Sequence, residues 1–179
     1  MIYIYKIKEI CNVEKWDAWN RQDALDWWPY PVYSSSSTWD WILWYRSKYD
    51  YAWEYLTRVV CWNAWTIFKR NWKFSMTNSC WLLNVLNKNL INQNYLYYYL
   101  TAFAKNYVNY QLTMMPKLKK EDMCNIDVHF PKDISKQEEI INILDKMSDY
   151  CNNINDWLEK ELNLREKQYK YYLNKLLTF

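Results

Sequence analysis

The chain has 179 residues, of which 23 are Lys or Arg and 20 are Asp or Glu, so its formal net charge is only +3. That length holds one ordinary domain and an appended element, and so small a charge does not by itself indicate nucleic-acid binding. Five scattered cysteines without a CxxC pair, together with a single histidine, exclude a Cys/His zinc site and indicate buried thiols in a reducing cytoplasm. The first residues alternate and soon become charged, so we expect neither a secretory signal nor a membrane span there.

Glycine is absent from the chain, whereas tryptophan occurs 13 times. Ordinary usage of about 7% predicts roughly 13 glycines in a chain of this length. The tryptophans stand in turn contexts rich in Asn, Asp, Ser, Thr and Pro, where positive backbone φ angles favour glycine. Four such contexts are Asp26-Trp27-Trp28-Pro29, Thr38-Trp39-Asp40-Trp41, Asn63-Ala64-Trp65 and Asn71-Trp72-Lys73.

We therefore predict that the natural chain carries glycine at the tryptophan positions, because a codon such as UGA, read here as tryptophan, would be decoded as glycine in the source. The alternative is a protein that is naturally rich in tryptophan and free of glycine. The intact mass of the natively expressed protein distinguishes the two.

Residues 1–86 are predicted to be rich in strands and turns, because short runs of β-branched and aromatic residues alternate with turn signals. Glycine at the tryptophan positions would sharpen each turn. The polar stretch Ser34–Thr38 is predicted to be an exposed loop between two strands. The predicted strands are Lys6–Val13, Tyr30–Tyr33, Glu54–Val60, Thr66–Arg70 and Ser79–Val85.

The pattern changes at Asn92, a predicted helix N-cap. From Tyr95 to Phe103, apolar residues recur at spacings of three and four, which predicts an amphipathic helix of three to four turns. A short turn, Leu118–Met123, and a strand, Asn125–Phe130, are predicted next. His129 lies within that strand and is interpreted as a structural rather than a catalytic histidine.

A long helix is predicted from Ser135 to the end of the chain. Ser135 and Glu138 form a capping-box pattern after the apolar Ile134. Apolar residues then recur with the 4-3-4-3-4 spacing of a coiled coil, and the pattern resumes one step late near Trp157, where a glycine would permit a kink or a break. Because no small domain covers such a helix along its length, we expect a partner helix. The positions predicted to face it are Ile140, Leu144, Met147, Cys151, Ile154, Leu158, Tyr169 and Leu176.

No nucleotide-binding glycine loop, metal-ligand cluster or nucleophile–base pair can be recognised in the sequence, so we expect no catalytic residue and no metal site. The carboxylate pairs Glu138/Glu139 and Glu159/Glu161 lie on charged faces of the long helix. Solvation or ion pairs explain them better than acid–base catalysis.

Basic residues lie near the predicted strand ends of the first half. Cationic loops on a rigid sheet can hold phosphates, and nearby Ser, Thr and Asn side chains can contact base edges. An ordinary solvated surface is the alternative interpretation. The residues predicted to face DNA, with Tyr33 nearby, are Ser34, Ser35, Ser36, Ser37, Thr38, Arg46, Lys48, Lys69, Arg70 and Lys73.

With glycine at the tryptophan positions, the chain resembles the specificity (S) subunit of type I restriction–modification systems. The resemblance covers essentially the whole chain in one order. The stretches that carry it are Tyr30–Ser35, Tyr49–Thr57, Trp65–Arg70, Tyr95–Leu100, Ile143-Leu144-Asp145 and Arg165–Phe179.

The resemblance implies an α+β fold. A target-recognition domain with mixed and antiparallel sheets and packed helices would span residues 1–133, and a conserved spacer and dimerisation helix would span residues 134–179. It further implies a cytoplasmic, non-catalytic subunit that binds double-stranded DNA, has no cofactor of its own and does not associate with a membrane. Methyltransferase subunits would bring S-adenosylmethionine, and a motor and restriction subunit would supply cleavage that depends on ATP and Mg²⁺.

In the family that the chain resembles, a full subunit carries two recognition domains and two antiparallel helices, whereas this chain carries one of each. We therefore expect two copies to pair on a palindromic split site, or this chain to pair with a separately encoded second half. Two other functions stay open, namely a coiled-coil adaptor that binds protein and a recognition domain cut from a fused DNA methyltransferase. DNA affinity that weakens steeply with salt would exclude the adaptor, and a methyltransferase motif in the adjoining reading frame would indicate the fragment.

Overall fold

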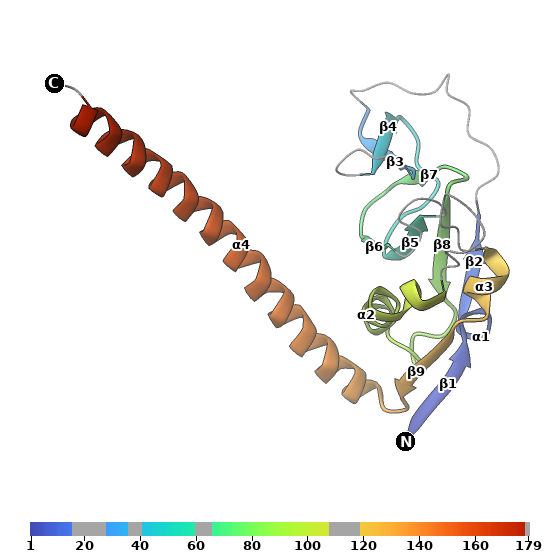
Figure 1. Cartoon of the computed structure of the whole chain (residues 1–179). Coiled ribbons are helices and arrows are strands. Elements are labelled where there is room, and N and C mark those ends of the chain that lie inside the picture. The colour runs from blue at the N-terminus through green and yellow to red at the C-terminus, as the bar shows by residue number, and fades with distance from the viewer. Residues whose placement is uncertain (16–27, 36–40, 60–65, 108–118, 178–179) are drawn as a thin grey trace. The chain divides into compact units, whose positions relative to one another are not determined.

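The computed structural model describes residues 1–15, 28–35, 41–59, 66–107 and 119–177 (Figure 1). The chain divides into two compact units, Met1–Glu138 and Glu139–Phe179. In chain order the elements are β1 (Ile2–Lys6), α1 (Ile7–Ile10), β2 (Cys11–Glu14), β3 (Tyr30–Tyr33), β4 (Ile42–Arg46), β5 (Tyr55–Val59), β6 (Ile67–Arg70), β7 (Ser75–Met76), β8 (Cys80–Val85), α2 (Gln93–Phe103), the 3₁₀ helix η2 (Ala104–Tyr107), α3 (Lys120–Cys124), β9 (Asp127–Pro131) and α4 (Ile134–Leu177).

Three small sheets form the framework of the first unit (Figure 1). The largest is antiparallel and has the strand order β2-β8-β5-β6. A second sheet has the order β4-β3-β7, in which β3 pairs antiparallel with β4 and parallel with β7. The third is the antiparallel pair of β1 and β9, which runs from Ile2 opposite Pro131 to Lys6 opposite Asp127. Together with the helices, these sheets confirm the predicted α+β fold with mixed and antiparallel pairing.

Two clusters of buried side chains stabilise this framework. The larger one joins the four-stranded sheet to the helices, and its fully buried members include Ile7, Ile10, Leu56, Leu83, Leu96, Leu100 and Phe130. The smaller one contains Phe74 and Met76, against which Tyr33, Tyr51 and Tyr55 pack. Each fully buried side chain of this size contributes about 1.5–3 kcal/mol. The smaller cluster is therefore what holds β3 and the segment after β6 in fixed positions.

Most of the predicted strands are confirmed, since β3, β5, β6 and β8 fall within the predicted ranges. The prediction of one strand over Lys6–Val13 is wrong, because the helical turn α1 interrupts it. The Lys6 amide donates to the Glu9 carboxylate (2.6 Å), which closes the turn and directs both Ile7 and Ile10 into the core. The strands β4 and β7 are not predicted from the sequence.

Tyrosines of α2 attach that helix to β9. Asn92 caps α2 as predicted, with its side-chain oxygen accepting from the Asn94 amide at 2.9 Å. The hydroxyl of Tyr95 donates to the His129 carbonyl (3.1 Å), and the hydroxyl of Tyr99 donates to the Asp127 carbonyl (3.0 Å). The His129 ring stacks on Tyr99 with a centroid distance of 6.3 Å. These contacts agree with the structural interpretation of His129.

The long helix α4 is continuous from Ile134 to Leu177 (Figure 1), so the chain with Trp157 shows no break at that position. The helix begins one residue earlier than predicted. Asp133 caps it, because its carboxylate oxygen accepts from the Ser135 amide at 3.0 Å. The predicted capping box of Ser135 and Glu138 is therefore wrong.

Two of the described tryptophans occupy backbone positions that suit glycine. Trp41 and Trp53 have φ angles of 60° and 82°, and within the described ranges no other residue has a positive φ. A side chain with a β-carbon is disfavoured there by about 1–2 kcal/mol. Trp81 is buried, and its indole nitrogen has no hydrogen-bond partner among the described residues. Glycine would remove the backbone strain and the buried unsatisfied donor, which supports the prediction that the natural chain carries glycine at these positions.

Candidate nucleic-acid interface and helical stripe

Lys69 and Arg70 end β6 and contact different parts of the first unit. The Arg70 guanidinium carbon lies 3.4 Å from the ring centroid of Tyr33, and its Nε donates to the Thr57 hydroxyl at 3.1 Å. The Lys69 ammonium instead lies 4.6 Å and 4.8 Å from the rings of Tyr97 and Tyr98 on α2. Since successive side chains of a strand point to opposite faces, the two cations do not belong to one surface.

Arg46 and Lys73 flank Tyr30 on the sheet that contains β3. Arg46 pairs in register with Tyr30 across β3 and β4, and its Nη1 donates to Asp50 (2.9 Å) and to Ser75 (3.1 Å). The Lys73 ammonium lies 5.9 Å from the Tyr30 ring and 4.8 Å from the Tyr49 ring. Lys48 lies nearby in sequence and is exposed.

The Ser34–Thr38 loop begins from a hydrogen-bonded anchor. Ser34 is buried, and its hydroxyl lies 3.3 Å from that of Ser79, which also accepts from the Ser35 amide at 3.0 Å. The hydroxyls of Thr77 and Ser79 are 2.6 Å apart. The side chain of Ser34 therefore positions the loop. Residues 36–38, which complete the predicted DNA-facing loop, lie outside the described residues.

The aromatic contacts order the cations without neutralising them. A cation over an aromatic face gains about 0.5–1 kcal/mol at an exposed site, and it keeps its full charge for a phosphate. Arg46 differs, because the ion pair with Asp50 offsets part of its charge. The arrangement near β3 can thus bind an anionic backbone through Arg70 and Lys73 and place the rings of Tyr30 and Tyr33 beside it. The sequence indicated Tyr33 beside the predicted residues but not Tyr30, whose ring lies near Lys73.

Buried ionisable groups in this unit are structural. Burial lowers the pKa of the Arg58 guanidinium to about 9, and its Nη1 lies 2.9 Å from the sulfur of Met123 inside the main core. Burial raises the pKa of the Cys11 thiol to about 12 and that of the Cys80 thiol to about 11. These thiols stay protonated at neutral pH and therefore lack the thiolate that nucleophilic chemistry requires.

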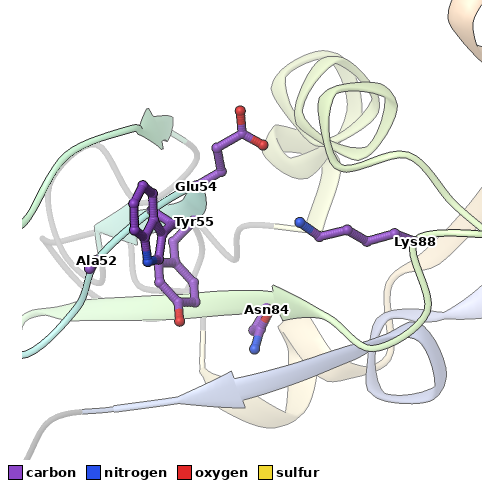
Figure 2. A pocket seen from close by; sticks show the side chains of 6 residues that line it. Ala52, Glu54, Tyr55, Asn84 and Lys88 are labelled. Atoms are coloured by element: carbon purple, nitrogen blue, oxygen red, sulfur yellow. The ribbon is translucent and has the colours of Figure 1, made fainter.

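A surface pocket of about 510 Å³ lies beside β5 and β8, and the residues that line it are not among those predicted to face DNA. Figure 2 shows the Glu54 carboxylate and the Lys88 ammonium extending from different segments into the same space. The mixed charges do not select an anion or a cation. Part of the wall is Trp53, which has a positive φ angle, and a glycine there would remove it. We assign no function to this pocket.

An exposed apolar stripe runs along α4. Ile140, Met147, Ile154 and Leu158 are between 36% and 58% exposed, Leu144 is partly exposed, and Cys151 is exposed. The side chains of Tyr169 and Leu176, also predicted to face a partner, lie outside those that the structure describes. A stripe of this size on a water-exposed helix is unusual for a surface with no partner.

The stripe is wider than the sequence pattern predicts. A further column of exposed residues repeats every seven positions without interruption and crosses the predicted slip at Trp157. Its members, 49% to 68% exposed, are Ile143, Tyr150, Trp157, Leu164 and Tyr171. In heptad terms this column adds g positions to the a and d positions already predicted. The exact seven-residue spacing is a signal that the sequence contains and that the prediction overlooks.

Among the residues that the structure describes, no group of three or more His, Cys, Asp or Glu is placed to hold a metal ion. No helix within the same residues is long and apolar enough to cross a membrane.

The first unit is a β-rich domain whose cations lie over aromatic rings. It is joined in sequence to a helix with an exposed apolar stripe. These features define a binding and assembly module. Residues 3–164 match the family model of the type I restriction modification DNA specificity domain. The chain therefore belongs to this family, which confirms the resemblance.

Similar sequences support this assignment, and a solved structure shares the fold. The type I restriction enzyme MpnII specificity subunit of Mycoplasma pneumoniae is 31% identical over 179 residues, which cover 98% of this chain and 52% of that protein. S.MpnORF285P, a candidate type I specificity subunit of the same organism, is 32% identical over 98% of this chain and 57% of its own length. The S subunit crystal structure from M. genitalium matches with a TM-score of 0.73 at 15% identity, over 99% of this chain and 46% of that one. The chain thus spans about half the length of the curated relatives it matches.

Proposed function

We propose that the chain provides the sequence-specific DNA-recognition domain, residues 1–133, and a spacer helix, residues 134–179, of the specificity subunit of a type I restriction–modification complex. The observation that carries this proposal is a family match that runs through both the sheet domain and the helix, from residue 3 to residue 164. The alternative, a coiled-coil adaptor whose sheet domain binds protein instead of DNA, predicts no salt-dependent affinity for DNA.

DNA is proposed to bind beside β3 and the end of β6. Arg70 and Lys73 supply charge there, with Arg46 and Lys48 at the neighbouring strand end, and the Ser34–Thr38 loop follows β3 in sequence. Lys69 is proposed to act at the margin of this surface, because two tyrosines of α2 hold it on the other side of β6. Phosphate contacts of this kind fix position, and loop side chains specify bases.

The a and d positions of α4 are proposed to pair with a second, antiparallel copy of the helix or with the helix of a separately encoded second half. A symmetric pair presents two identical recognition domains, so its target is a palindromic split sequence. At about 1.5 Å per residue, the 44 residues of α4 span roughly 66 Å. The paired helices would then fix the distance between the two half-sites.

The additional g column supports a second helical contact. A seam of a and d positions is enough for two helices, whereas an apolar face that includes g positions is typical of a helix in a larger bundle. We propose that this column docks the methyltransferase subunits. Those subunits would bring S-adenosylmethionine, and the motor subunit would bring ATP and Mg²⁺, while this chain supplies neither catalysis nor cofactor and acts in the cytoplasm.

A DNA-binding titration at increasing salt tests the proposal. The probe is a pool of randomised 40-base-pair duplexes from which the full-length chain selects its sites. We expect an enriched split palindrome and an affinity that falls by about 0.9 log units per log unit of salt for each phosphate neutralised. Failure to enrich any sequence, with weak binding that does not depend on salt, would exclude a DNA specificity subunit and favour the adaptor.

A further inference from the structure

Gln137 is a fully buried polar residue in the first turn of α4, with 0% of its surface exposed. Its amide nitrogen donates to the carbonyl oxygen of Pro131 at 2.8 Å and to that of Leu90 at 3.1 Å. Its amide oxygen accepts from the backbone N–H of Asn92 at 2.8 Å. The orientation of the amide is fixed by its partners, because carbonyls can only accept and a backbone N–H can only donate.

These three partners come from separate parts of the recognition domain. Pro131 is the last residue of β9 and pairs with Ile2 of β1. Leu90 precedes α2, and Asn92 is the N-cap of α2, so one side chain links the end of a strand and the start of a helix to the first turn of α4. All of these residues lie within the unit Met1–Glu138. No other described side chain of that turn is fully buried.

Gln137 lies at the start of a long helix, so a small change in helix direction at this residue produces a large displacement at the far end of α4. A helix of roughly 66 Å converts a change of about 3° at its first turn into a displacement of about 3.4 Å at its far end, which is the rise of one base pair. Each base pair also rotates the next half-site by about 35°. A specificity subunit can distinguish half-site spacings that differ by one base pair only if the direction of its helix, where it leaves the recognition domain, varies by less than about 3°.

We propose that Gln137 is a positioning residue that attaches the spacer helix to the recognition domain and so restricts the half-site spacing that the paired subunit accepts. The proposal rests on the proposed function. It assigns Gln137 no contact with DNA. Loss of its hydrogen bonds should therefore leave the half-site sequence unchanged and alter only the tolerated spacing.

Selection from the randomised 40-base-pair pool tests this with full-length variants. Gln137→Ala removes all three hydrogen bonds, and Gln137→Glu keeps the side-chain size and the acceptor for Asn92 but loses both donors. Lys136→Ala and Glu138→Gln, exposed positions on the same turn, are the matched controls. Thermal melting of each variant is measured alongside.

We expect the parent chain and both controls to enrich two half-sites at a single spacing. Both Gln137 variants should enrich the same half-sites at spacings that spread over one or two additional base pairs, with affinity for the preferred spacing reduced about threefold to tenfold. A single unchanged spacing in a folded Gln137 variant, even one with a lower melting temperature, would overturn the proposal. So would loss of folding in both variants, since Gln137 would then be a residue of the general fold. Failure of the parent to enrich any site would instead count against the proposed function.

Discussion

Arg70 and its strand neighbour Lys69 contact rings on different elements, with Arg70 3.4 Å above Tyr33 of β3 and Lys69 4.6 Å from Tyr97 of α2. Adjacent cations in a sequence are easily taken as one phosphate-binding pair. In this strand they point to opposite faces, and Arg70 is the one seen to contact a residue of β3.

The two cations should therefore differ in their effect on DNA binding. We expect Arg70→Ala to weaken binding to all sequences by about tenfold, or about 1.4 kcal/mol, and to lower the salt slope by about one phosphate. Lys69→Ala should have a smaller effect, and the double variant should resemble Arg70→Ala. Fluorescence anisotropy at several salt concentrations measures this, with Lys88→Ala as the control. Equal losses for the two single variants would place DNA across both faces of β6.

Charge on the stripe of α4 should prevent pairing. Leu144→Asp and Ile154→Asp each place a carboxylate where the proposed interface has no partner for it, and an unpaired buried charge costs several kcal/mol. Light scattering should report monomers for both variants and pairs for the parent chain. Asn153→Asp adds the same charge at an exposed position beside the stripe, and this control should remain paired. A parent chain that is a well-behaved monomer with an intact helix would contradict the pairing.

The sequence predicts regular elements better than it predicts their junctions. Runs of β-branched and aromatic residues between turn signals identified β5, β6 and β8, and the three–four spacing identified α2 and α4. The start of α4 was misplaced because Asp133 competes with Ser135 as the cap, and hydrogen bonding decides between them only in three dimensions. The opposite directions of Lys69 and Arg70 follow from the predicted strand itself. The rings that the two cations contact depend on which elements flank β6, which no local pattern encodes.

The g column of α4 should be separable from the a and d positions. Tyr150→Asp and Leu164→Asp alter residues that are 68% and 60% exposed. We expect both variants to keep the helix pair, with affinity reduced less than tenfold, and to lose binding to the methyltransferase subunit. Co-purification with that subunit and light scattering of the chain alone measure the two properties. Variants that lose the helix pair but still bind the methyltransferase subunit would show that the g column pairs the helices and that the a and d positions bind the methyltransferase subunit.

Thiol reactivity should distinguish buried from helical cysteines. Burial raises the pKa of Cys11 to about 12 and that of Cys80 to about 11, so at pH 8 both lack the reactive thiolate, whereas Cys151 is exposed on α4. We expect an alkylating reagent to modify Cys151 before Cys11 and Cys80, as followed by mass spectrometry. Alkylation of Cys151 should become faster when the protein is diluted, because pairing covers the a and d positions. The raised pKa values also mean that both thiols stay protonated to a higher pH in the folded state than in the unfolded state, where they ionise near 9.0. Stability should therefore fall as the pH rises above 9.

Glycine should stabilise the chain at Trp53 but not at Trp72. Trp53 has a φ angle of 82°, so Trp53→Gly relieves the strain of a β-carbon in the left-handed region and should raise the free energy of unfolding by about 1 kcal/mol. Trp72 is similarly exposed, at 65% against 79%, but its φ angle is not positive, which makes Trp72→Gly the matched control with no expected gain. Denaturant unfolding measures both. A gain in the free energy of unfolding at position 53 alone would show that the benefit of glycine comes from the positive φ angle. The intact mass of the natively expressed protein then decides whether glycine occupies the tryptophan positions in the natural chain.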